Sequence, residues 1–209
     1  MTKRALFLGP HTDDVELGAG GTVAKFVESY EVHVVAFSDA MDAQPERLPE
    51  DTLTGEMKGA MDVLGVHQER VHMLGFRTRY FHSARQEVLD ALIRIRDEVR
   101  PDIVFAPSTY DRHQDHQVVV NEVLRAFKGS NSTILGYEQP WNNFSFETSC
   151  FVPLDEVHIG KKLEALARYR SQEHRLYLNE EFIRGLASVR GTQIGTTYAE
   201  AFEVMRVIL

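Results

Sequence analysis

The chain has 209 residues, of which 43% are hydrophobic, so it is long and apolar enough to form the core of one large domain. It carries 31 acidic residues against 23 lysines and arginines, a formal net charge of -8, and no dense basic segment. We therefore expect no nucleic-acid partner and no attachment to an anionic membrane, because both need clustered positive charge.

No segment approaches the ~18 consecutive apolar residues of a transmembrane helix, and the N-terminal residues lack the apolar core of a signal peptide. The single cysteine, Cys150, excludes a disulfide within the chain and is compatible with a reducing compartment. These features predict a cytoplasmic protein without membrane insertion.

Short apolar or β-branched runs predict strands, and apolar residues at helical spacing predict helices. The first half predicts, in order, a strand over 4–10, a glycine-rich helix over 18–30, a strand over 31–37, a loop over 38–52, a helix over 54–64, a strand over 70–76 and a helix over 82–99. The second half predicts a strand over 102–107, a loop over 108–116, a helix to about 127, a strand over 132–138, an irregular aromatic stretch over 139–153, helices over 159–170 and 178–189, and a strand from 199.

Strands and helices thus alternate for most of the length, which predicts an α/β fold with a mostly parallel sheet and helices on both faces, three layers in all. We expect one domain over residues 1–209, because no linker, repeat or low-complexity tract interrupts the pattern. The less regular last third should cover one end of the sheet.

Two polar loops follow predicted strands, over 9–17 and 107–116. In open α/β sheets, ligands bind beyond the carboxyl ends of the strands, so both loops should open onto one crevice. The first loop reads PHTDDVELG and supplies His11, Asp13, Asp14 and Glu16. The second reads YDRHQDH and supplies Asp111, His113, Asp115 and His116.

Imidazole and carboxylate groups together suit Zn²⁺ and neighbouring divalent ions such as Fe²⁺, Mn²⁺ and Co²⁺. A catalytic zinc site takes three protein ligands and keeps a position for water. The two loops hold more such groups than a structural site needs. A further carboxylate would then serve as general base, and a further histidine would act near the oxyanion.

Structural interpretations of the same residues remain open. Asp13 or Asp14 could cap a helix, the HxxH pair could be a polar helix face, and the spare carboxylates could orient the histidines. The segment GAGGT does not match the dinucleotide pattern G-x-G-x-x-G, since Val23 stands where the third glycine belongs, so it favours close helix–sheet packing. The other histidines are expected to be structural or at the surface: His33, His67, His72, His82, His158 and His174.

The sequence resembles the PIG-L/LmbE-like de-N-acetylases in PHTDDVELGAGGT, EMKGAMDVLGV, DRHQDH, KKLEALARYRSQ and AEAFEV, which span nearly the whole chain. The resemblance implies a Rossmann-like fold and zinc-dependent removal of an N-acetyl group from an amino sugar or its conjugate, with release of acetate. It implies that the metal ligands are His11, Asp14 and His116. It also implies that Asp13 is the general base, that His113 stabilises or protonates at the oxyanion, and that Asp115 tunes His113.

The sequence departs from the family pattern at two positions. Thr12 replaces the usual proline, which should alter the stiffness of the loop and leave the ligands intact. Leu53 stands three residues before Glu56, where many members carry an arginine that helps to grip the substrate, so the substrate is expected to differ from the better-known ones.

An aromatic stretch contains Tyr137, Trp141, Phe144 and Phe146. Its residues could line a sugar-binding cleft by stacking on ring faces, or form a hydrophobic lid or a subunit contact. Tyr137 and Trp141 are the candidate substrate contacts.

Two alternative functions compete with deacetylation. One is another metal-dependent hydrolase, of the phosphoesterase type, in which Glu16 and Asp111 would extend the site to a second ion. The other is a non-catalytic sugar- or nucleotide-binding module. Asp13 and His113 beside a full ligand set favour catalysis. The acylated substrate and the oligomeric state, a homo-oligomer included, stay open.

Overall fold

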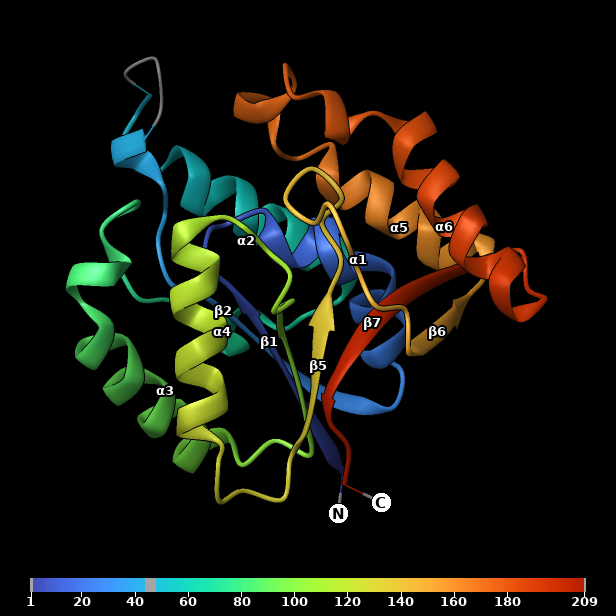
Figure 1. The fold of residues 1–209 in the computed structure, drawn as a ribbon. Coiled ribbons are helices and arrows are strands. Elements are labelled where there is room, and N and C mark those ends of the chain that lie inside the picture. The colour runs from blue at the N-terminus through green and yellow to red at the C-terminus, as the bar shows by residue number, and fades with distance from the viewer. Residues whose placement is uncertain (1, 44–47, 209) are drawn as a thin grey trace.

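A computed structural model describes residues 2–43 and 48–208 and contains a seven-stranded sheet with the strand order β3-β2-β1-β4-β5-β7-β6 (Figure 1). Its strands are β1 (Lys3–Gly9), β2 (Tyr30–Ala36), β3 (Val71–Met73), β4 (Ile103–Pro107), β5 (Thr133–Tyr137), β6 (Cys150–Leu154) and β7 (Tyr198–Arg206). The first five strands run parallel, and β7 runs antiparallel to both β5 and β6. The expectation of a mostly parallel sheet is confirmed.

Helices cover both faces of this sheet, which gives the three layers predicted (Figure 1). They are α1 (Asp14–Phe26), α2 (Thr52–Leu64), α3 (Arg85–Val99), α4 (Gln114–Ala126), α5 (Glu156–Leu166) and α6 (Glu180–Ile194). Side chains alternate along β1, so that Ala5 and Phe7 pack under α1 and α2 while Leu6 and Leu8 pack under α3 and α4. In the described part of the chain, no helix has the length and apolarity needed to cross a bilayer.

The carboxyl ends of β1 and β4 lie side by side, because the two strands pair in parallel with Phe7 opposite Phe105. Helix α1 begins at Asp14 directly after the first loop, four residues earlier than predicted. Helix α4 begins at Gln114, so Asp115 and His116 occupy its first turn and not a loop. Strand β6 was missed, because its sequence CFVPL contains a proline and follows an irregular polar stretch.

The glycine-rich segment lies inside α1, where the helix is broken at Ala19 (φ -146°, ψ 16°). It packs closely, as the sequence suggested: a Cβ atom on Gly18 would lie 2.3 Å from Tyr137 Cδ2, and one on Gly21 would lie 2.5 Å from Leu154 Cδ1. A Cβ atom at Gly18 would clash with the Tyr137 ring, and one at Gly21 would require the end of the Leu154 side chain to shift.

A buried ion pair satisfies the backbone groups near this break. The N–H groups of Gly21 and Thr22 donate to the Glu200 carboxylate at 3.0 and 2.6 Å. Lys162 Nζ donates to the Leu17 carbonyl at 2.7 Å and to Glu200 Oε1 at 2.6 Å. Lys162 and Glu200 therefore hold the broken helix to α5 and β7 and leave few of its polar groups unpaired.

Replacing Glu200 with glutamine should lower the free energy of unfolding by about 3–5 kcal/mol, because the Lys162 ammonium would stay buried without its counter-charge. Denaturant unfolding followed by circular dichroism measures this change. Glu164→Gln, in the exposed i,i+4 pair with Arg168, is the matched control and should change stability little. Equal, small effects of the two substitutions would contradict the structural role of the buried pair.

Candidate active site

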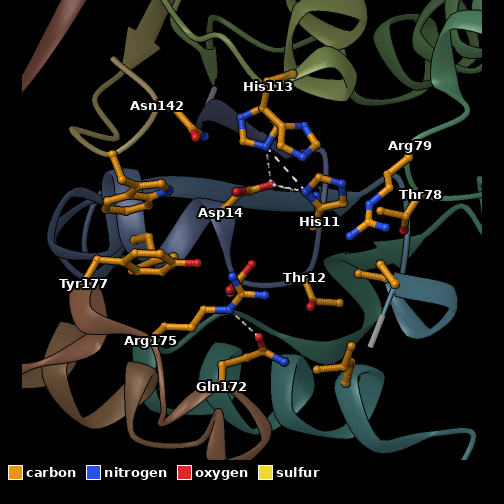
Figure 2. Close-up of a pocket in the computed structure, with 17 residues that line it drawn as sticks. His11, Thr12, Asp14, Thr78, Arg79, His113, Asn142, Gln172, Arg175 and Tyr177 are labelled. Atoms are coloured by element: carbon orange, nitrogen blue, oxygen red, sulfur yellow. Dashed lines mark hydrogen bonds and ion pairs between the residues drawn. The ribbon is translucent and has the colours of Figure 1, made fainter. Parts of the chain in front are cut away.

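The two polar loops meet at the carboxyl ends of β1 and β4, on the floor of a cavity of about 240 Å³ (Figure 2). His11, Asp13 and Asp14 come from the loop and helix start after β1, and His113 and His116 come from the segment after β4. The walls come from segments far away in the sequence, including residues 78–79, 141–142 and 172–177. The last third of the chain thus covers this end of the sheet, as predicted.

Three side chains converge on one point. His11 Nδ1 lies 3.2 Å from Asp14 Oδ2 and 3.4 Å from His116 Nε2, and His116 Nε2 lies 3.3 Å from Asp14 Oδ2. In a tetrahedral zinc site with bonds of about 2.0–2.1 Å, neighbouring ligand atoms are about 3.3 Å apart. The three atoms therefore already have the spacing that such an ion requires, and their chemistry, two imidazoles and one carboxylate, fits it too.

The ring nitrogens that face away from this point are held by carboxylates. His11 Nε2 lies 3.1 Å from Asp115 Oδ2, and His116 Nδ1 lies 2.7 Å from Asp111 Oδ2. Each carboxylate accepts the ring N–H, which leaves the lone pair on the nitrogen that points to the candidate ion. Both rings are thus oriented for a metal, and each reaches the tautomer that a metal ligand needs when its inner nitrogen loses its proton.

The contacts of these two carboxylates differ from the sequence expectations. Asp115 was expected to tune His113, but its carboxylate contacts His11, and only its backbone N–H donates to His113 Nδ1, at 3.2 Å. Asp111 was considered as a ligand for a second ion, but it orients His116. The sequence left open that the spare carboxylates orient the histidines, but sequence spacing does not tell which histidine each carboxylate meets.

Asp14 is held on both oxygens. Its Oδ2 accepts the His11 backbone N–H at 2.7 Å, and its Oδ1 accepts from Gln139 Nε2 at 3.0 Å. Burial favours the neutral acid, but His116 and His11 outweigh it and hold the pKa of Asp14 well below its usual range. The ligand carboxylate is therefore ionised and fixed in place.

The carboxylates make the cluster attractive to positive charge. Burial lowers the pKa of the His11 imidazole, but Asp115 and Asp14 more than reverse this effect and raise it to about 9. Burial acts in the same way on His116, and Asp14 and Asp111 raise its pKa to about 10. A divalent ion competes with protons for the same nitrogens, so metal binding here is coupled to proton release.

Asp13 and His113 line the same cavity without belonging to this three-atom cluster. Asp13 stands at the N-cap of α1 but makes no capping hydrogen bond with its side chain. Burial and the adjacent Asp14 raise the pKa of Asp13 to about 6. Burial and the neighbouring His116 and His11 lower the pKa of His113 to about 4, so this imidazole is neutral at pH 7. Since its Nδ1 accepts from the backbone, its Nε2 carries the proton.

Glu16 is fully buried on α1 and cannot serve as a ligand for a second ion. Its Oε1 contacts the hydroxyl of Tyr169, and burial raises the pKa of Glu16 well above its usual range. The Tyr169 hydroxyl also reaches the Thr12 carbonyl. The Tyr169 hydroxyl thus lies within hydrogen-bond distance of both Glu16 Oε1 and the Thr12 carbonyl, while Glu16 Oε2 has no partner among the described residues. Tyr169 thereby contacts the loop that lacks the proline of the family pattern.

The two candidate substrate contacts have different positions. Tyr137 is 1% exposed, and its hydroxyl donates to the Leu8 carbonyl at 3.0 Å, so the expectation that it lines the cleft is wrong. Trp141 does line the cavity, where it stacks on Tyr177 with ring centroids 4.0 Å apart. Phe144 is 74% exposed and stacks with Arg112 outside the lining.

Several wall residues carry no sequence signal and were missed: Arg79, Asn142, Arg175 and Tyr177. They lie in connecting segments without periodicity or motif. Leu53, the apolar replacement noted in the sequence, is also part of the wall.

Among the residues that the structure describes, two groups of side chains have ligand atoms close enough to hold an ion: His11 with Asp14 and His116, and His11 with His113 and Asp115. We expect the first group to bind, so His116→Ala should lose zinc and His113→Ala should retain one ion per chain. Elemental analysis of the purified variants after dialysis against zinc measures this. Loss of zinc from the His113 variant alone would instead identify the second group.

The outer carboxylates should tune affinity without being ligands. Asp111→Asn should weaken zinc binding by about 10- to 100-fold, because the amide orients and polarises His116 less well. Competition with a chromophoric chelator measures the change in Kd. Glu98→Gln, an exposed carboxylate on α3, is the control and should leave Kd unchanged.

The chain is similar to known proteins over most of its length. It is 30% identical over 178 residues to the uncharacterised deacetylase YaiS of Escherichia coli K12, an alignment that covers 81% of this chain and 91% of YaiS. It is 25% identical to N,N'-diacetylchitobiose deacetylase from Pyrococcus horikoshii, with a TM-score of 0.77 and coverage of 97% and 84% of the two chains. The 4-carboxy-2-hydroxymuconate hydratase GalB from Pseudomonas putida KT2440 has a TM-score of 0.80 at 22% identity, over 99% and 98% of the chains, and shares the fold.

The sequence profile of the GlcNAc-PI de-N-acetylases, PIG-L, matches residues 6–127. That range includes both loops of the site and the strands that place them. The protein therefore belongs to the PIG-L family.

Proposed function

We propose that this protein is a zinc-dependent hydrolase that removes the N-acetyl group from an amino sugar or amino-sugar conjugate and releases acetate. The observation that carries the proposal is the spacing of 3.2–3.4 Å among His11 Nδ1, Asp14 Oδ2 and His116 Nε2. Asp13 lines the same cavity and does not belong to this group. Two similar proteins, YaiS and the N,N'-diacetylchitobiose deacetylase, are named as deacetylases, which supports the reaction. The chitobiose substrate in the second name supports the substrate class.

An ion bound by His11, Asp14 and His116 would supply a Lewis acid that polarises the acetamide carbonyl and lowers the pKa of water to roughly 7. The two-nitrogen, one-oxygen ligand set favours zinc, and Fe²⁺, Mn²⁺ and Co²⁺ are the competitors to assay beside it.

Asp13 is the proposed general base. A carboxylate with a pKa raised to about 6 is ionised at neutral pH and still basic enough to accept a proton. It takes a proton from the attacking water as the C–O bond forms. It returns that proton to the nitrogen as the C–N bond breaks, so that the amine leaves and acetate remains.

His113 is the proposed oxyanion donor. As a neutral imidazole with its proton on Nε2, it donates a hydrogen bond to the developing negative charge without first giving up a proton. Its position at the start of α4, with Nδ1 on the Asp115 N–H, keeps the ring from turning.

The stacked rings of Trp141 and Tyr177 offer an aromatic surface at the cavity wall for the apolar face of a sugar. This surface favours a sugar substrate. The phosphoesterase alternative is weaker, because Glu16 and Asp111 are engaged with Tyr169 and His116 and are not free to bridge two ions.

Asp13→Asn should keep one zinc ion per chain and lower kcat by about 10²- to 10⁴-fold, because the amide cannot accept the proton of the water. Acetate release from N-acetylglucosamine and from N,N'-diacetylchitobiose, measured beside the metal content, tests this. Asp97→Asn, on the exposed face of α3, is the matched control and should retain full activity. Full activity of the Asp13 variant would disprove the assignment of the base.

A further inference from the structure

Two guanidinium groups enter the cavity beside the candidate active site. Arg79 comes from the segment between β3 and α3, and Arg175 comes from the segment between α5 and α6. Both line the cavity, and Figure 2 shows them reaching toward the same space from different sides. Both residues are solvent-exposed, so their charges are available to a ligand.

Neither guanidinium is neutralised within the described part of the chain. No carboxylate oxygen of these residues lies within 4.0 Å of either group, whereas Arg85 pairs with Glu122 and Arg190 pairs with Glu138. Arg175 Nε donates to Gln172 Oε1 at 2.6 Å, and this is a neutral partner. In a protein with a net charge of -8, two unpaired arginines in one cavity indicate a ligand that carries negative charge.

Arg79 is tied to the candidate metal site through its backbone. Its φ angle is 68°, in the left-handed region that residues other than glycine rarely adopt. Its N–H donates at 2.6 Å to Asp115 Oδ2, the same carboxylate oxygen that orients His11. The strained backbone is thus held by the network around the candidate ion, which fixes where the Arg79 side chain begins.

Arg175 is positioned by a second set of contacts. The Ser171 N–H and hydroxyl donate to the Glu56 carboxylate at 3.0 and 2.6 Å, which anchors the short helical turn Arg170–Gln172 against α2. Gln172 then holds Arg175 Nε. The Arg175 guanidinium also lies over the Tyr177 ring, 5.8 Å from its centroid. Both of these partners are uncharged, so the positive charge of Arg175 is available to a ligand in the cavity.

We propose that Arg79 and Arg175 form a subsite for an oxyanion, a carboxylate or a phosphate, carried by the amino-sugar substrate next to its acetamide. The planar guanidinium binds both of these groups through paired hydrogen bonds. Since Asp13 and Asp14 share the cavity, an acidic substrate would be repelled unless cations offset them. This inference rests on the proposed function and names the class of substrate for the same site.

The test uses the zinc-loaded enzyme and compares acetate release from N-acetylglucosamine with release from its 1-phosphate, its 6-phosphate and its 3-O-lactyl ether. We expect kcat/KM to be about tenfold or more higher for at least one acidic sugar, the value of a charge-assisted contact. A preference for a phosphate or for the lactyl ether distinguishes the two oxyanions.

Arg79→Gln and Arg175→Gln should each lower kcat/KM about tenfold more for the acidic sugar than for the neutral sugar, mainly by raising KM for the acidic sugar, so that the preference disappears. Arg94→Gln replaces an exposed arginine on α3 and makes the same charge change away from the cavity. It should change kcat/KM for neither the acidic nor the neutral sugar. Equal kinetics for acidic and neutral sugars, or equal effects of the arginine variants on both, would overturn the subsite.

Titration calorimetry with glucosamine and glucosamine 6-phosphate gives a measurement that does not require turnover. Arginine-dependent binding of the acidic amine without hydrolysis of any acetamide would refute the proposed function and keep the subsite. Hydrolysis of N-acetylglucosamine without preferential binding of any acidic sugar would refute the subsite and keep the proposed function.

Discussion

The pairing of β1 with β4 is the constraint on which the site depends. Parallel neighbours end at the same edge of a sheet, so the segments after them can share a pocket although more than a hundred residues separate His11 from His116. Because the ring nitrogens and the Asp14 oxygen then lie within 3.4 Å of one another, little conformational entropy remains to be lost when an ion binds. Asp111 and Asp115 complete this order by fixing both rings.

The first loop needs support that its own residues do not supply. Helix α1 is broken at Ala19, and the Lys162–Glu200 pair compensates the backbone groups near the break. Tyr169 reaches the loop itself through the Thr12 carbonyl. The C-terminal segments that contain Lys162, Tyr169 and Glu200 therefore support the site indirectly, because they contact α1 and the loop that precedes it.

Much of this arrangement could be predicted from the sequence. Alternating apolar patterns indicated the sheet and its two helical layers, and the position of polar loops after strands indicated one crevice, because both depend on local sequence and a general rule of α/β folds. The partners of Asp115 and Asp111 could not be predicted, since they depend on the rotation of α4 against β1. Tyr137 was assigned to the cleft because of its neighbours in the sequence, yet as the last residue of β5 it points into the core.

The residues proposed to react with the acetamide and the residues of the cavity wall lie on different segments of the chain. The groups proposed to act on the acetamide come from the segments that follow β1 and β4, while Trp141, Arg175 and Tyr177 come from irregular segments that line the cavity wall. Such wall segments can change without disturbing the sheet, so one fold can serve different reactions, and a hydratase shares it. In this chain Leu53 is apolar, and the arginines of the wall, Arg79 and Arg175, stand on other segments. The charge of the wall is therefore set by residues outside the metal-binding loops, and under the proposed subsite these residues select the substrate.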